Sequence, residues 1–336
     1  MTIDAARRSA LLATKLGVLV REHAGEAPCV FGTMSGGAAL VRDEPDGRTA
    51  WVLADERPGR VLGPAMAWAR QQGCDHLEVL LDDAAAAGIV ARRAACFRPA
   101  PGVWQVSGRL VSPAVAAPVL VEPGVDPRLA DLAPVIVAGG ASVVIEHGVL
   151  AGEVAGLEVC RAVLDPDTGE ARLEVGVGAH DREAFTLMHG NLPTADALAR
   201  VVAAVAPHRA PGAQLHPLNR LGAERLLRHR LIAEPALVGA AHLAPASPPE
   251  PRTNLKDPVP CVADGWDASG RPIVVVCSTG IDLDLVPFAA DARLTRHADA
   301  RLVVAVPVRD RHPITVDLAS RLDPPADVIG LDLTIA

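Results

Sequence analysis

Apolar and polar residues follow two different periods along this chain, and each period predicts a different kind of element. Near the N-terminus, Leu12, Leu16 and Leu19 recur at helical spacing, and Lys15 interrupts the apolar run between them. This spacing predicts an amphipathic helix instead of a secretion signal. Further along, GGAALVRDEPDGRTAWVLADE has apolar stretches on both sides of an Asp-Gly turn at 46–47, and it predicts two strands joined by that turn.

The first hundred residues continue with elements of both kinds. PGRVLGPAMAWARQQGC and AAAAGIVARRAACF have the apolar spacing of helices, while HLEVLLD and GVWQVSGRLV have the composition of strands. We therefore expect a mixed α/β unit over residues 1–110. Residues 111–128 are rich in proline and alanine and have no helical periodicity, which is typical of a linker.

A second α/β unit is expected over residues 129–242. SVVIEHG, GEVAGLEVCRAVL and ARLEVGVG have the composition of three strands, and the turn DPDTGE joins the last two. PTADALARVVAAV and PLNRLGAERLLRHRLI each predict a helix. Thr194 suits the N-cap of the first, and Pro217 lies near the start of the second.

A third unit is expected after a proline-dense segment without periodicity at residues 243–260. Residues 261–336 contain PIVVVCS, RLVVAVPV, the helical stretch ITVDLASRL and DVIGLDL. Uninterrupted apolar strands favour a sheet covered on both faces, and the order strand, helix, strand favours parallel pairing. The predicted fold class is α/β, with several small mixed or parallel sheets flanked by helices in two or three packed units.

The composition narrows the classes of function. Half of the 336 residues are apolar, which is enough for a large core, and the formal net charge is −8. That charge argues against general binding to nucleic acid or anionic membranes, because neutralising phosphates requires a cationic face. No run of about 18 uncharged apolar residues occurs, so we expect no membrane helix. The six cysteines form no CxxC motif and favour reduced thiols in the cytoplasm.

The first candidate site follows the strand PIVVVCS. Asp282 and Asp284 lie two residues apart after it, and therefore on one side if the chain stays extended, and Asp291 follows Pro287. Carboxylates beyond the carboxyl end of a buried strand lie where open α/β sheets bind ligands. Three hard oxygen ligands could hold Mg²⁺ or Mn²⁺. The alternative is that the aspartates face solvent and stabilise the helix that follows.

Two further polar residues strengthen this candidate. Asp310 and His312 follow the strand RLVVAVPV. If this strand is the parallel neighbour of PIVVVCS, both side chains end beside Asp282 and Asp284 at the same edge of the sheet. We therefore predict a common catalytic centre of these four residues, in which His312 could exchange a proton with a substrate.

A second candidate lies in the middle unit. Glu158 and Glu174 are on strands joined by one turn, so that a suitable register brings them together on one face. Glu146 and His147 end the preceding strand, and two carboxylates with a histidine suit divalent-metal or acid–base chemistry. The order of elements resembles the core of restriction-endonuclease-like proteins, but Gly176 stands where that core has a lysine. The alternative is a hairpin whose Glu and Arg side chains pair across strands.

The strongest basic patch is on the predicted helix PLNRLGAERLLRHRLI. A cationic helix face could bind a phosphate group or a nucleic-acid backbone. The alternative is a solvated face that pairs with the acidic remainder of the chain. The patch consists of Arg220, Arg225, Arg228 and Arg230.

These observations leave three hypotheses for function. The first is a divalent-metal-dependent hydrolase, nuclease-like and acting on phosphodiesters. The second is a non-catalytic protein that binds a small molecule or a partner. The third is a nucleic-acid-associated factor that docks through the Arg-rich helix. Neither GxxxxGK nor GxSxG occurs, so the sequence carries no P-loop and no nucleophile-elbow motif.

Overall fold

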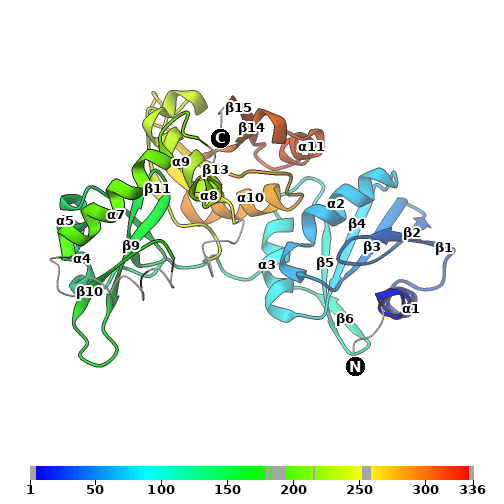
Figure 1. Ribbon diagram of the computed structural model, residues 1–336. Helices are drawn as coiled ribbons and strands as arrows, with labels where there is room; N and C mark the ends of the chain where they lie inside the picture. The colour runs from blue at the N-terminus through cyan, green and yellow to red at the C-terminus, as the bar shows by residue number, and fades with distance from the viewer. Residues whose placement is uncertain (1–4, 179–181, 183–193, 215, 252–258, 333–336) are drawn as a thin grey trace. The chain divides into compact units, whose positions relative to one another are not determined.

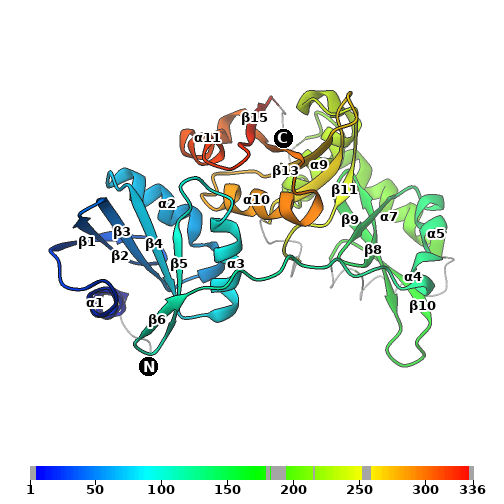
Figure 2. The same ribbon diagram turned by 180° about the vertical axis from the view of Figure 1, so that it is seen from behind.

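The computed structural model describes residues 5–178, 182, 194–214, 216–251 and 259–332. These residues form three sheets flanked by helices, which confirms the predicted α/β class (Figures 1 and 2). The chain divides into two compact units, and each contains segments from distant parts of the sequence. Unit 1 comprises Met1–Val119, Ile281–Asp291 and His312–Asp327, and unit 2 comprises Leu120–Gly280, Ala292–Arg311 and Val328–Ala336.

Unit 1 contains a six-stranded sheet in the order β1-β2-β3-β4-β5-β6. The predicted hairpin at the Asp-Gly turn is confirmed, since β2 and β3 pair antiparallel with Glu44 opposite Gly47. The β3–β4 and β4–β5 pairs are parallel. The elements are α1 (Ala5–Ala24), β1 (Cys29–Met34), β2 (Gly37–Glu44), β3 (Gly47–Ala54), α2 (Leu62–Gln71), β4 (His76–Leu81), α3 (Ala84–Ala94), β5 (Gly102–Ser107), β6 (Leu110–Pro113) and α11 (Pro313–Ser320).

Helices cover both faces of this sheet. The predicted N-terminal helix is α1, whose Leu16 and Leu19 are buried in one cluster with Leu40 and Leu53 of the strands. On the opposite face, a side chain at Gly32 would collide with the ring of Trp68 in α2. Figures 1 and 2 show α1 on one side of the sheet and α2 with α3 on the other.

Unit 2 contains the other two sheets. One is antiparallel, in the order β10-β9-β8-β7, and the other is mixed, in the order β11-β12-β13-β14-β15. The parallel pairing predicted for PIVVVCS and RLVVAVPV is confirmed by β13 and β14. The elements are α4 (Pro127–Ala130), α5 (Ala133–Ala138), β7 (Ser142–Glu146), β8 (Val149–Val154), β9 (Leu157–Leu164), β10 (Ala171–Val175), α7 (Thr194–Arg209), α8 (Pro217–Arg220), α9 (Ala223–Ala233), β11 (His242–Ala246), β12 (Cys261–Trp266), β13 (Pro272–Cys277), β14 (Arg301–Pro307) and β15 (Asp327–Leu331). Helix α10 (Leu285–Arg296) contributes residues to both units.

Several stretches predicted as single elements are divided by turns. GEVAGLEVCRAVL forms β8 and β9, because Ala155 and Gly156 adopt positive φ angles and reverse the chain. PLNRLGAERLLRHRLI forms α8 and α9, separated at Gly222, which is also left-handed. A side chain at Gly156 would collide with backbone atoms of α9, so this turn requires glycine for space as well as for conformation. Residues 243–246, at the start of the expected linker, belong to β11 instead.

No described helix is both long and apolar enough to cross a membrane.

Candidate functional site

The acidic stretch after β13 folds against arginines of α3 within unit 1. Asp291 is fully buried, and its two oxygens accept hydrogen bonds from Arg92 at 2.8 and 2.9 Å. Oδ2 of the same carboxylate also accepts one from Arg93 Nε at 3.0 Å. Asp284 accepts a hydrogen bond from the Gly63 amide at 3.1 Å and one from Arg93 Nη1 at 3.4 Å. Arg93 thus joins two of the three predicted metal ligands.

The third predicted ligand, Asp282, is partly exposed and pairs with Arg60. Its Oδ1 accepts a hydrogen bond from the Asp284 amide at 3.0 Å. Among the described residues, no group of three or more His, Cys, Asp or Glu side chains is arranged to hold a metal ion. The positive charge beside these carboxylates comes from arginines.

The pKa of the Asp284 carboxyl group is shifted far from its ordinary value. Burial raises the pKa of Asp284 to about 7, against the opposing influence of Arg93 and of the Gly63 amide. Burial disfavours the charged form because water solvates a carboxylate better than the protein interior does. The charge of this buried group therefore changes near neutral pH.

Asp310 and His312 each accept a hydrogen bond from a backbone amide of their own unit. Asp310 follows β14 and accepts a hydrogen bond from the Gly280 amide at 2.8 Å, within unit 2. His312 belongs to unit 1, where its Nδ1 accepts a hydrogen bond from the Ile314 amide at 3.3 Å and caps α11. These contacts account for both side chains as loop and cap residues. The common catalytic centre stays a prediction.

In unit 2, three glutamates surround arginines of α9. The register places Glu153 of β8 directly opposite Glu158 of β9, and both are buried. Like charges at opposite positions destabilise a sheet. Arg225 offsets this repulsion, because its Nη1 lies 3.2 Å from Glu153 and 3.6 Å from Glu158, and its Nη2 donates to Glu146 at 2.9 Å. Arg228 also pairs with Glu146 and lies 3.3 Å from Glu153.

The structure brings the predicted pair Glu158 and Glu174 together through an arginine. Arg182 Nη1 donates a hydrogen bond to Glu158 at 3.2 Å, and its Nε lies 3.6 Å from Glu174. Glu174 is also directly opposite Arg161 in the ladder between β9 and β10, and Arg161 in turn pairs with Glu158 at 2.9 Å. This is the cross-strand pairing of Glu and Arg that the sequence offered as the alternative to a catalytic site.

The predicted basic patch is divided by burial. Arg225 and Arg228 are buried and face the glutamates of unit 2. Arg230 is partly buried, and Arg220 ends α8 with a side chain outside the described residues. Two of the four cations are therefore engaged inside the protein, and docking of nucleic acid through this helix stays a prediction.

A small cavity of about 90 Å³ adjoins the glutamate cluster. Arg225 and His147 both line it, and each has a buried nitrogen, Nε and Nε2 respectively, without a hydrogen-bond partner in the described part of the chain. This space is large enough to admit water. It is smaller than the roughly 300–1,000 Å³ typical of ligand pockets.

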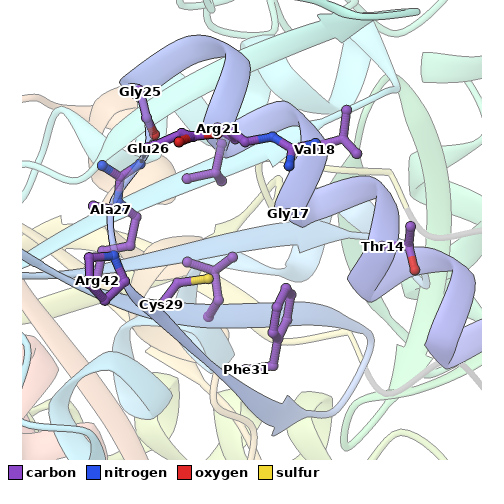
Figure 3. A pocket seen from close by; sticks show the side chains of 13 residues that line it. Thr14, Gly17, Val18, Arg21, Gly25, Glu26, Ala27, Cys29, Phe31 and Arg42 are labelled. Carbon is purple, nitrogen blue, oxygen red and sulfur yellow. Dashed lines mark hydrogen bonds between the residues drawn. The ribbon is translucent and has the colours of Figure 1, made fainter.

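A larger cavity, of about 660 Å³, lies between α1 and β1 in unit 1, and we call it the α1–β1 cavity (Figure 3). One wall is the face of α1 that carries Gly17, Val18 and Arg21, since Arg21 follows Val18 by three residues and Gly17 by four. Figure 3 shows the side chains of Cys29 and Phe31 pointing from β1 toward this helix. The volume falls within the range of ligand pockets, roughly 300–1,000 Å³.

Two arginines give this cavity a polar end. Arg42 is buried, and its Nη atoms donate to the carbonyl oxygens of Ala24 and Gly25 at 3.2 Å, at the C-terminus of α1. Its Nε lies 3.5 Å from Glu44 and has no hydrogen-bond partner among the described residues. Arg21 is exposed and forms no ion pair with any described residue. The apolar walls thus end at two cationic groups.

The sequence analysis missed this cavity. Its space depends on Gly17, because a Cβ at that position would lie 3.0 Å from the Phe31 ring. A glycine inside a strongly periodic helix was the available signal, since it lowers helix stability and often has a packing reason. The stretch CVFGTM, which forms β1, was not identified as a strand. Its absence of charge was the second signal.

Comparison of the chain with protein-family models, with curated proteins and with solved structures finds no match. The function therefore has to be inferred from the chemistry of the sites.

Proposed function

We propose that this chain is a non-catalytic binding protein that receives the apolar part of a ligand or partner in the α1–β1 cavity. The observation that supports this proposal is the cavity itself, with a volume of about 660 Å³. Its walls include Val18, Phe31 and Leu40, and its few charged groups include Arg21 and Arg42. An apolar hollow with a small number of polar groups is typical of binding sites.

The charged clusters support the same proposal. A metal-dependent hydrolase needs carboxylates that can bind an ion and a water. Asp284 and Asp291 instead accept hydrogen bonds from arginines, and Glu158 accepts them from Arg161 and Arg182. We assign these acids a role in stability.

The cysteines are consistent with a reducing, cytoplasmic location, because all six are free thiols. Burial raises the pKa of Cys277 well above its usual range, so this thiol at the end of β13 stays protonated. Cys29 is exposed and lines the α1–β1 cavity, whereas Cys74 is half-buried elsewhere in unit 1. A thiol reagent can therefore modify the cavity at Cys29.

The test uses the dye 1-anilinonaphthalene-8-sulfonate (ANS), whose rings and sulfonate match the apolar walls and the arginines. We expect saturable binding of one ANS per chain in the Cys74→Ser variant. Modifying Cys29 with N-ethylmaleimide should weaken that binding about tenfold or more, equivalent to about 1.4 kcal/mol or more. Bound ANS should also slow the modification.

The matched control is Cys29→Ser/Cys74→Ser, which should keep its ANS affinity after the same treatment. Absence of saturable ANS binding, or affinity that modified Cys29 leaves unchanged, would contradict the proposal. A Mg²⁺- or Mn²⁺-dependent thermal shift that disappears in Asp282→Asn/Asp284→Asn would favour the hydrolase instead.

A further inference from the structure

The edges of the three sheets differ in how they are protected against pairing with another strand. An exposed edge usually carries a charge or a proline, because either one hinders the addition of a further strand. Among the six edge strands of the described chain, β1 alone has neither, with the sequence CVFGTM. The other five edge strands carry Pro113 in β6, Glu146 in β7, Arg172 and Glu174 in β10, Pro245 in β11, and Asp327 in β15.

Strand β1 also exposes apolar side chains on both of its faces. Val30 is 72% exposed on one face, and Phe31 is 48% exposed on the face toward α1. The strand pairs with β2 on one side only. In an antiparallel pair, alternate residues direct their N–H and C=O groups away from the partner, so the free side of β1 offers a row of donors and acceptors.

The α1–β1 cavity opens on the same strand. Cys29 and Phe31 point toward α1, so a strand added beside β1 would direct alternate side chains to that same side of the sheet (Figure 3). The charged residues that line the cavity are Arg21, Arg42 and Glu26, which sum to one positive charge. An acidic residue in the added strand would therefore find Arg21 without a competing ion pair from the described residues.

Resting on the proposed function, we infer that the occupant of the α1–β1 cavity is an extended segment of a partner protein. This segment adds to the sheet beside β1, places alternate apolar side chains in the cavity and sets a carboxylate against Arg21. Main-chain hydrogen bonds provide affinity in such β-strand addition, and alternate side chains provide specificity. A second copy of this chain fits less well, because its own β1 brings no acid to Arg21.

The test uses a fluorescein-labelled peptide, Val-Thr-Val-Thr-Val-Thr-Glu, whose valines and glutamate share one face of a strand, with affinity measured by fluorescence polarisation. Two matched peptides are methylated on the backbone nitrogens of the three valines or of the three threonines. Because N–H groups of alternate residues point the same way in a strand, one pattern blocks the pairing and the other leaves it intact. We expect one methylated peptide to lose about tenfold or more in affinity, and the other to bind like the parent.

Charge exchange tests the contact with Arg21. The Arg21→Glu variant should bind the parent peptide about tenfold more weakly, and it should recover affinity for a peptide ending in Lys. The Val30→Lys variant places a charge on the edge strand outside the cavity. It should lower the affinity for the peptide but leave the affinity for ANS unchanged.

The following results would each contradict part of the proposal. Equal effects of the two methylation patterns overturn strand addition. If ANS binds and the peptide does not, the inference of strand addition is wrong and the proposed function is unaffected. If neither probe binds, both the inference and the proposed function are wrong. A dimer in sedimentation that Val30→Lys dissociates shows that a second copy occupies the edge, and it overturns the partner segment.

Discussion

Two regions of unit 1 differ in how fully their charged side chains form ion pairs. In the cluster around Asp284 and Asp291, carboxylates and the arginines of α3 meet at 2.8–3.4 Å in the protein interior. In the α1–β1 cavity, most of the wall is apolar, Arg21 has no ion-pair partner among the described residues, and Phe31 is half-exposed. In the first region the opposite charges compensate one another in the protein interior. Room remains where a glycine in α1 and an open edge strand limit the packing.

The difference lies in how each region compensates the cost of burying a charge. Burying an unpaired charge is so costly that each buried carboxylate needs a cation and hydrogen bonds. The arginines of this chain meet that need in both units, with Arg93 in one and Arg228 in the other. We therefore propose a role in stability for the paired charges and a role in binding for the α1–β1 cavity.

The largest expected effect is on stability, through the Asp291→Asn variant. Loss of this charge removes the carboxylate that the buried Arg92 and Arg93 share, which should lower the free energy of unfolding by about 3–5 kcal/mol. Urea denaturation followed by circular dichroism measures the change. The control is Asp55→Asn, which removes a partly exposed ion pair with Arg8 and should cost less than about 1 kcal/mol. Equal effects of the two variants would contradict the contrast between the regions.

A second effect on stability is expected in its pH dependence. The pKa of Asp284 is about 7 in the folded protein and ordinarily 3.8, so the folded state holds this proton more tightly than the unfolded state. The stabilisation is complete below about pH 4 and is lost as the pH rises toward 7, by at most about 1.4 kcal/mol per pH unit.

The measurement compares wild type with Asp284→Asn by urea denaturation across this pH range. The variant cannot titrate at this position, so its free energy of unfolding should fall less steeply than that of the wild type between pH 4 and 7. Parallel curves for the two proteins would show that Asp284 does not change its charge there.

The smallest effect on stability is expected in the cavity, where binding should change instead. Phe31→Ala should lower the free energy of unfolding by less than about 1 kcal/mol, because the ring is already half-exposed. The same variant should weaken ANS binding about tenfold. Val30→Ala on the opposite face of β1 is the control and should keep full ANS affinity. A large loss of stability with unchanged ANS binding would contradict the proposal that Phe31 contributes to binding and little to stability.

The sequence alone predicted elements wherever the signal was local. The turn at Asp46 and Gly47 and the uninterrupted apolar runs of β13 and β14 lie within short windows, and the structure confirms them. The breaks at Ala155 and Gly222 were missed, because the residues around them continue the same apolar pattern on both sides. Periodicity records which residues are buried, and it does not record where the chain reverses.

The candidate sites depended on contacts that no local pattern contains. Asp291 and Arg92 are 199 positions apart, and Glu146 and Arg228 are 82 positions apart. The sequence identified the acids and the Arg-rich helix as notable, but it could not state that they neutralise other charges. The sequence analysis did not identify β1, which is notable because, in the described sheet, a strand pairs with only one of its two sides.

Hydrophobic periodicity and turn residues by themselves determined the α/β class and most of the helices and strands, because these depend on near neighbours in the chain. The order of elements favoured the parallel pair β13 and β14. Only the tertiary structure decided which carboxylate meets which arginine and where a hollow remains. Those outcomes depend on how segments far apart in sequence pack, and on whether a residue such as Gly17 leaves space between them.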